Sequence, residues 1–217
     1  MMRYFYLHGF ASSPQSFKAR DLADRFRSRG QELTLLDFNE GGFADLTLTR
    51  QIQQTERAIV AEPNEPVTLI GSSFGGLTAL WVAERCPQVV RLVLLAPALG
   101  FPRSWHRRLS PEQVADWERS GELLVYHYSE QRQLPLKFSF LQDSDHYDSS
   151  TLCRSLPTTI LHGRADETVS IDLSRDWVRD HPWVNLIELD TDHGMGSAIE
   201  TIWQAIVDRC DLPPLAA

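Results

Sequence analysis

The sequence predicts a single α/β domain, in which a mainly parallel β-sheet is covered by helices on both faces. Six short apolar runs alternate with stretches of helical periodicity, which implies parallel strands joined by right-handed crossovers. The runs are almost continuously apolar, as expected for strands that are buried on both faces. The length of 217 residues suits one domain, residues 1–217, with a sizeable core.

The six apolar runs mark the expected strands, at residues 4–7, 33–36, 67–70, 92–95, 159–161 and 186–189. Between them, apolar residues recur three or four positions apart, as on one face of a helix. We expect Phe17, Leu22 and Phe26 to share the apolar face of the first helix. The clearest helical pattern lies near the end of the sequence, at Ile199, Ile202, Trp203, Ile206 and Val207.

One segment, at about residues 97–150, breaks this alternation. Ser110 and Gln113 form a capping-box pattern with Pro111 at the first helical position, and Gly121 is the expected end of that helix. The apolar stretch at residues 123–128 fits either a strand or a helix. An insertion after the fourth strand lies at the edge where such sheets bind ligands. We therefore interpret it as a cap over a site. The alternative is an insertion that only packs against the domain and has no role in substrate choice.

Composition excludes several classes of protein. Apolar residues make up 42% and charged residues 23%, which is an ordinary balance for a soluble domain. The net charge of −8 disfavours nucleic acid as a partner, and the apolar runs are too short to span a membrane. The start of the sequence does not fit a signal peptide, and the three cysteines show no metal-binding spacing. We expect a cytoplasmic protein and leave its oligomeric state open.

The most informative motif is G-x-S-x-G at residues 71–75, directly after the third apolar run. This spacing is typical of a nucleophile elbow, where a strand turns sharply into a helix with a serine at the apex. The glycines Gly71 and Gly75 remove side chains that would collide within the turn. Ser73 is the predicted nucleophile, and an ordinary strand-to-helix turn is the alternative.

A serine hydroxyl needs a base, and the base needs a carboxylate to orient it. His193 follows the last apolar run, and Asp166 follows the fifth. We favour Asp166 over Asp190 and Asp192, because residues adjacent to a histidine in a turn usually point away from it. Glu167 is a weaker competitor, and the other histidines are interpreted as structural or solvated.

The oxyanion of an ester's tetrahedral intermediate requires N–H donors. The loop at residues 8–14 follows the first strand and contains Gly9. We assign the donors to the backbone N–H groups of Phe10 and of Phe74, the residue after the nucleophile. A plain tight turn at residues 8–9 is the alternative.

Together these motifs resemble the α/β-hydrolase superfamily, and residues 7–14 and 71–76 look most like the small bacterial YqiA-type esterases. The likeness spans nearly the whole chain. It implies the α/β-hydrolase fold, with a six-stranded, mainly parallel sheet in the strand order 2-1-3-4-5-6. Many larger relatives begin with two antiparallel strands. The sequence shows no apolar runs for them, because the run at residues 4–7 already precedes the loop of the oxyanion site.

The expected function is that of a serine hydrolase cleaving carboxylic esters of small acyl or aryl substrates through an acyl-enzyme, without cofactor or metal. An acyl-CoA thioesterase, or a lyase or C–C bond hydrolase, would use the same triad and stays an alternative, as does a non-catalytic binding protein. Trp105 is a candidate for the substrate pocket. Arg103 and Arg107, with the neighbouring Arg108, form a solvated face in the simpler interpretation, or bind an anionic substrate in the other.

Overall fold

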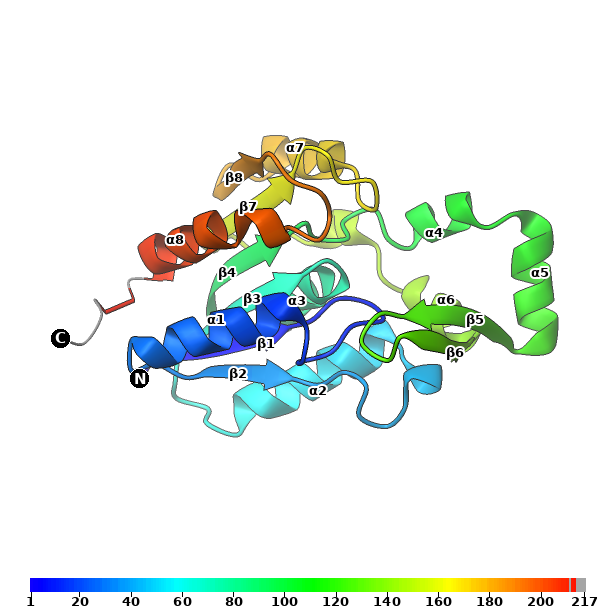
Figure 1. The fold of residues 1–217 in the computed structure, drawn as a ribbon, viewed down its shortest axis with the longest axis horizontal. Helices are drawn as coiled ribbons and strands as arrows, with labels where there is room; N and C mark the ends of the chain where they lie inside the picture. Colours follow the sequence, from blue (N-terminus) through cyan, green and yellow to red (C-terminus); the bar gives the residue numbers. More distant parts are fainter. Residues whose placement is uncertain (211, 214–217) are drawn as a thin grey trace.

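The computed structural model describes residues 1–210, 212 and 213, and a six-stranded parallel sheet forms its centre (Figure 1). The strands are β1 (Arg3–Leu7), β2 (Leu33–Leu36), β3 (Val67–Ser72), β4 (Val89–Leu95), β7 (Thr158–Gly163) and β8 (Val184–Leu189). They lie side by side in the order β2-β1-β3-β4-β7-β8. Numbered within this sheet alone, that order is 2-1-3-4-5-6, so the predicted topology is confirmed.

Helices cover both faces of the sheet (Figure 1). They are α1 (Phe17–Ser28) and α8 (Ile199–Cys210) on one face, with α2 (Leu48–Val60), α3 (Phe74–Arg85) and α7 (Ile171–Asp180) on the other. Alternation along β1 divides the core, because Tyr4 and Tyr6 pack with α1 and α8 while Phe5 and Leu7 pack on the opposite side. No helix of the described residues has the length and apolar character needed to cross a bilayer.

One residue of the predicted apolar face of α1 lies outside the core. Leu22 and Phe26 are fully buried, whereas Phe17 is 56% exposed. Leu22 follows Phe17 by five positions, and a rotation of about 100° per residue places the two side chains about 140° apart around the helix. Phe17 lines the large cavity described below instead of the core.

Between β4 and β7 the chain forms the insertion, which lies beyond the carboxyl ends of the central strands (Figure 1). Its elements are α4 (Arg103–Arg108), α5 (Pro111–Ser120), β5 (Glu122–His127), β6 (Arg132–Lys137) and α6 (Ser139–Ser144). Strands β5 and β6 pair antiparallel, so the ambiguous stretch at residues 123–128 is strand. The capping box at Ser110 is present, and Gly121 ends α5 with φ 79°, both as predicted.

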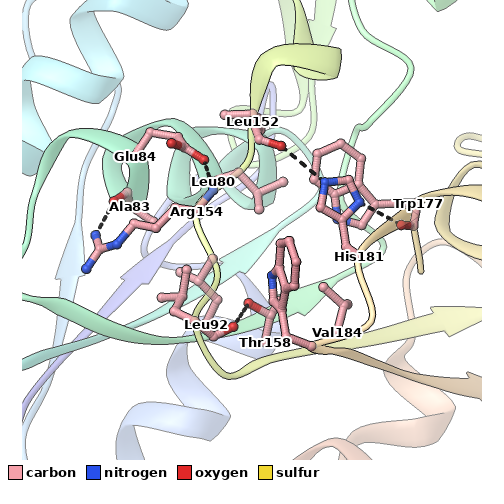
Figure 2. Close-up of a pocket in the computed structure, with 12 residues that line it drawn as sticks. Leu80, Ala83, Glu84, Leu92, Leu152, Arg154, Thr158, Trp177, His181 and Val184 are labelled. Atoms are coloured by element: carbon pink, nitrogen blue, oxygen red, sulfur yellow. Dashed lines mark hydrogen bonds between the residues drawn. The ribbon is translucent and has the colours of Figure 1, made fainter. Parts of the chain in front are cut away.

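Short 3-10 segments complete the list of elements: η1 (Phe43–Asp45), η2 (Ser149–Thr151) and η3 (Gly196–Ala198). Where the insertion returns to the sheet, polar contacts fix it to α3 (Figure 2). The Arg154 guanidinium donates to the carbonyls of Ala83 and Cys86 at the end of that helix. Glu84 in turn accepts from the N–H groups of Cys153 and Arg154, at 2.7 and 2.6 Å. The base of the insertion is therefore held firmly against the domain.

Beside these contacts the His181 ring stacks on Trp177, with centroids 3.9 Å apart (Figure 2). Its Nδ1 and Nε2 lie 2.8 Å from the carbonyl oxygen of Trp177 and 3.1 Å from that of Leu152. The pocket that these side chains help to line has a volume of about 10 Å³. That is room for at most one water molecule, so the pocket is too small for a substrate.

Candidate active site

Ser73 stands at the sharp turn between β3 and α3. Its backbone has φ 52° and ψ −114°, a left-handed φ that residues other than glycine rarely adopt. Its N–H donates to the Leu95 carbonyl at 2.8 Å, which ties the turn to β4. Such strain persists only where the surrounding structure enforces it, and it is found most often at functional sites.

The two glycines of the motif are required by close backbone contacts. A Cβ added to Gly75 would lie 2.1 Å from the carbonyl oxygen of Leu7, and one added to Gly71 would lie 2.5 Å from that of Gly75. No side chain fits at such distances. The G-x-S-x-G spacing thus reflects the close approach of the turn to itself and to β1.

Asp166 and His193 lie on the loops that follow β7 and β8. The His193 Nδ1 donates to the Asp166 Oδ2 at 2.7 Å. Because a carboxylate only accepts, Nδ1 carries the ring proton and the neutral ring keeps a lone pair on Nε2. The other oxygen of Asp166 accepts from the N–H groups of Thr168 and Val169, at 2.8 and 2.7 Å.

The Asp166 side chain is completely buried. Burial alone would raise its pKa, but hydrogen bonds from His162, His193 and the Val169 N–H together lower the pKa well below its ordinary value. The carboxylate is therefore charged at neutral pH. A fixed negative charge at this position can stabilise the imidazolium that forms when His193 takes up a proton.

His162, at the end of β7, is a second histidine against this carboxylate. Its Nε2 lies 2.9 Å from the Val169 carbonyl oxygen and 3.2 Å from the Asp166 Oδ2. Both partners only accept, so Nε2 carries the proton, and Nδ1 accepts from the Ser174 hydroxyl at 2.8 Å. The sequence interpretation made this ring structural and missed its contact with Asp166. The spacing of four residues across one loop is the pattern that points to it.

Ser73 and His193 line the same cavity, which has a volume of about 710 Å³. In the described part of the chain, no hydrogen bond joins the Ser73 hydroxyl to the His193 ring. Such bonds are often long before substrate binds and tighten afterwards. Within the same residues, none of the rival carboxylates Asp190, Asp192 and Glu167 bonds to this ring either.

Phe10 and Phe74 also line the cavity. Among the described residues neither backbone N–H has a hydrogen-bond partner, which for Phe74 follows from its place at the start of α3. The loop after β1 passes close to Ser73, because a Cβ added to Gly9 would lie 3.4 Å from the Cβ of Ser73. Two residues with unpaired N–H donors thus line the same cavity as Ser73.

The loop that carries Phe10 is held by a buried histidine. The Nε2 of His8 accepts from the Phe38 N–H at 3.0 Å, so Nδ1 carries the proton and donates to the Gly9 carbonyl at 2.9 Å. Burial lowers the pKa of His8, which keeps the ring neutral. The tautomer of this ring therefore fixes the backbone just before Phe10.

The insertion is hydrogen-bonded to the same loop. The Tyr128 N–H donates to the Ala11 carbonyl at 2.9 Å. The His127 Nδ1 accepts from the Glu130 N–H, so its Nε2 donates to the Asn39 side-chain oxygen at 3.2 Å. Asn39 in turn donates from its amide nitrogen to the carbonyl of Ser12.

The substrate-binding candidates of the insertion lie in different places. Trp105 lines the cavity, where its ring is 5.1 Å from that of Phe10. Arg103 and Arg107 are exposed and do not belong to the lining. Arg108 does line the cavity, and its guanidinium donates to the Thr168 carbonyl. The described residues include no group of three or more potential metal ligands.

A family model described as "Uncharacterised protein family (UPF0227)" matches residues 3–208. The protein belongs to the UPF0227 family. This membership agrees with the YqiA-type resemblance of its motifs. No curated protein matches the sequence significantly.

Solved structures confirm the α/β-hydrolase fold of this UPF0227 member. Alpha/beta hydrolase domain-containing protein 10 from mouse is 25% identical with a TM-score of 0.79, over 96% of this chain and 89% of that chain. Est1E from Butyrivibrio proteoclasticus with ferulic acid bound is 17% identical with a TM-score of 0.81, over 97% and 90%. A monoacylglycerol lipase from Paleococcus ferrophilus is 17% identical with a TM-score of 0.73, over 94% and 92%.

Proposed function

We propose that the protein is a serine hydrolase that cleaves carboxylic esters of small acyl or aryl substrates through an acyl-enzyme. The observation that carries this proposal is the 2.7 Å bond between His193 and Asp166, at a cavity that Ser73 also lines. Among the proteins of the same fold, one has ferulic acid bound and another is named a monoacylglycerol lipase. Both names agree with ester chemistry.

The proposed reaction begins when the Ser73 hydroxyl attacks the ester carbonyl and His193 Nε2 takes its proton. Asp166 holds the imidazole tautomer and stabilises the imidazolium. The N–H groups of Phe10 and Phe74 donate to the oxyanion of the tetrahedral intermediate. His193 then protonates the leaving alcohol, and an acyl-enzyme remains. A water molecule activated by His193 hydrolyses it and regenerates Ser73.

The cavity supports a small, partly apolar substrate. Its volume of about 710 Å³ lies in the range of small-molecule sites. The rings of Phe10, Phe74, Trp105 and Phe140 form a connected cluster, with centroids 5.1–6.3 Å apart in the contacting pairs. Such a surface suits an acyl chain or an aryl group. We further propose that the insertion is the cap of a single domain, since its residues line this cavity.

The test compares the wild-type protein with Ser73→Ala on short p-nitrophenyl esters. We expect kcat to fall on the order of 10⁴- to 10⁶-fold, because the attacking oxygen is lost. The matched control is Ser28→Ala at the exposed end of α1, for which we expect wild-type turnover. A fluorophosphonate probe should label the wild type and leave Ser73→Ala unlabelled. Equal turnover or equal labelling of the two proteins would contradict the proposal.

A second measurement separates ester hydrolysis from a lyase or C–C hydrolase on the same triad. Rapid quenching during turnover followed by mass spectrometry should find the acyl group on Ser73. Turnover with no acyl adduct at any quench time would favour the other chemistry.

A further inference from the structure

The lining of the cavity comes from both faces of the sheet. The aromatic cluster of Phe10, Phe74, Trp105 and Phe140 belongs to the core on the face covered by α2 and α3. The ends of β1 and β3 and the start of α1 contribute the polar side, namely Tyr6, Ser16, Lys18 and Ser72, with Tyr6 and α1 packed on the opposite face. Burial raises the pKa of Tyr6 to about 12, although the hydroxyls of Ser72 and Ser16 beside it act in the opposite direction. The Tyr6 hydroxyl therefore stays protonated and can donate.

Lys18 is the cation of this polar side. It lies in the first turn of α1, and its half-buried side chain lines the cavity. Among the described residues its ammonium group makes no hydrogen bond and no ion pair. The only other lysine of the sequence, Lys137, behaves differently, because its ammonium pairs with Asp45 at 2.5 Å on the surface.

The fold does not explain this lysine. A cation in the first turn of a helix opposes the helix dipole. Burial lowers the pKa of Lys18 to about 8, and the charges of Asp166 and Asp192 offset this only in part. Both carboxylates already have other donors, since Asp192 accepts from the Met195 N–H at 3.0 Å and Asp166 from His193 and backbone N–H groups. The ammonium donors therefore remain available to a ligand in the cavity.

The position of Lys18 relative to the reaction indicates which part of a substrate it meets. In the proposed mechanism His193 protonates the leaving oxygen, so the alcohol part of the ester lies on the His193 side of Ser73. The charges of Asp166 and Asp192 act on Lys18. Asp192 is the neighbour of His193 on the loop after β8, and Asp166 is hydrogen-bonded to His193 from the loop after β7. The aromatic cluster packs on the face of the sheet opposite α1, and we assign the acyl group to it.

We propose that Lys18 binds an anionic group, a carboxylate or a phosphate, on the alcohol part of the ester. This inference rests on the proposed ester hydrolysis and specifies its substrate class. A lysine ammonium is a compact point charge that accepts either anion, and a charge-assisted hydrogen bond in a partly enclosed site is among the stronger polar contacts. The substrates are then esters with an apolar acyl group and a negatively charged alcohol.

The first test uses acetate esters of para-substituted phenols, with the same acyl group and with a charged or a neutral substituent on the ring. We compare 4-acetoxybenzoate and 4-acetoxyphenyl phosphate, each with the neutral methyl 4-acetoxybenzoate, and take the ratio of kcat/KM values. Lys18→Met should lower the anionic-to-neutral ratio about 10- to 100-fold, and Lys18→Arg should preserve most of it. Lys137→Met, which removes an equal charge outside the cavity, should leave the ratio as in the wild type. The ester with the larger loss identifies carboxylate or phosphate as the preferred anion.

The second test uses pH. Lys18 must be protonated to bind an anion, so the wild-type ratio should fall as the pH rises through about 8 and should stay level in Lys18→Arg. Asp166 and Asp192 act on Lys18 directly, and the other ionisable groups that line the cavity are Tyr6, Arg108, Tyr126, Tyr128, Glu167 and His193. Their effects on the chemical step largely cancel in the ratio of the kcat/KM values of two acetate esters. If Lys18→Met does not fold, the comparison of the wild type with Lys18→Arg still decides the question.

A binding measurement separates this inference from the proposed function. Calorimetry with 4-hydroxybenzoate, on Ser73→Ala and on Ser73→Ala combined with Lys18→Met, needs no turnover. We expect binding about tenfold or more weaker in the double variant. If no ester is hydrolysed but this difference appears, the hydrolase proposal fails and the anion site stands. If esters are hydrolysed while Lys18→Met changes neither the ratio nor the binding, the role of Lys18 is refuted.

Discussion

Asp166→Asn provides a sharp test of the acid–base assignment, because the surroundings of this side chain fix how the amide must lie. One carboxylate oxygen accepts from the N–H groups of Thr168 and Val169. In the variant, the amide oxygen stays there, since an amide nitrogen would face two backbone donors. At the other position the amide nitrogen faces only one donor, the His162 Nε2–H at 3.2 Å, which keeps its shorter contact with the Val169 carbonyl at 2.9 Å. The NH₂ group then replaces the oxygen that meets His193 Nδ1 at 2.7 Å. It donates to Nδ1 and so forces the ring proton onto Nε2.

With the proton on Nε2, His193 cannot accept the proton of Ser73. The negative charge that would stabilise the imidazolium is lost at the same time. The same change in a serine protease triad lowers kcat about 10⁴-fold. A factor of 10⁴ corresponds to about 5 kcal/mol of transition-state stabilisation. We therefore expect kcat/KM to fall by three to five orders of magnitude, with the nucleophile still in place.

The assay is kcat/KM on a short p-nitrophenyl ester, together with the circular dichroism spectrum and Tm to show that the variant is folded. The control is Asp190→Asn, an equal carboxylate-to-amide change on the loop that carries His193, at a position that is exposed. It should retain activity within about tenfold. A folded Asp166→Asn protein with activity within tenfold of the wild type would refute the tautomer argument. Loss of activity in Asp190→Asn alone would move the acid to that residue.

Two further predictions concern stability. Gly75→Ala should unfold at a Tm lower by several degrees or more, because overpacking against backbone costs about 1–3 kcal/mol or above. Gly196→Ala, where an added Cβ meets nothing within 4 Å, is the control, and an equal Tm for the two variants would contradict the packing argument. Burial lowers the pKa values of His8 and His127 below 6.5. Below pH 6.5 these rings take up protons more readily in the unfolded chain than in the native protein. The free energy of unfolding is therefore at its full value above pH 6.5 and falls as the pH decreases below it, by at most about 1.4 kcal/mol per pH unit for each ring. Denaturant titrations at pH 7.5, 6.5 and 5.5 measure this slope, and a slope unchanged in a double glutamine variant would exclude these two rings as its source.

The central sheet was predictable because its information is local. Each strand is a short apolar run, and the order of the strands follows from the resemblance of the two motif loops. The helix from Pro111 to Ser120 was equally readable, since capping box, proline and terminal glycine are all encoded within a few residues. Residues 123–128 were ambiguous for the same reason, because their pairing partner lies across a turn and periodicity alone does not identify it.

The residues that sequence analysis missed depend on contacts between distant segments. Lys18 lies near Asp166 and Asp192 only because the first helix starts beside the loops after β7 and β8. His162 was interpreted through its own strand end, and its contact with Asp166 depends on how the intervening loop folds back. Arg103 and Arg107 show the reverse case. Three arginines close together in sequence were interpreted as one face, either solvated or anion-binding, yet of the three only Arg108 lines the cavity.

The candidate site consists of two halves that are supported by different parts of the fold. The Phe10 loop is held by His8 and by the insertion, through the Tyr128 N–H. The acid–base half is held by β7 and α7, where His162 bridges Asp166 and Ser174. Changes in the insertion should therefore act on oxyanion stabilisation and on the shape of the acyl side. Changes around His162 should act on the protonation of His193. In the proposed reaction, the protonation of His193 and the selectivity for the acyl group thus depend on separate groups of residues, and each can change without the other.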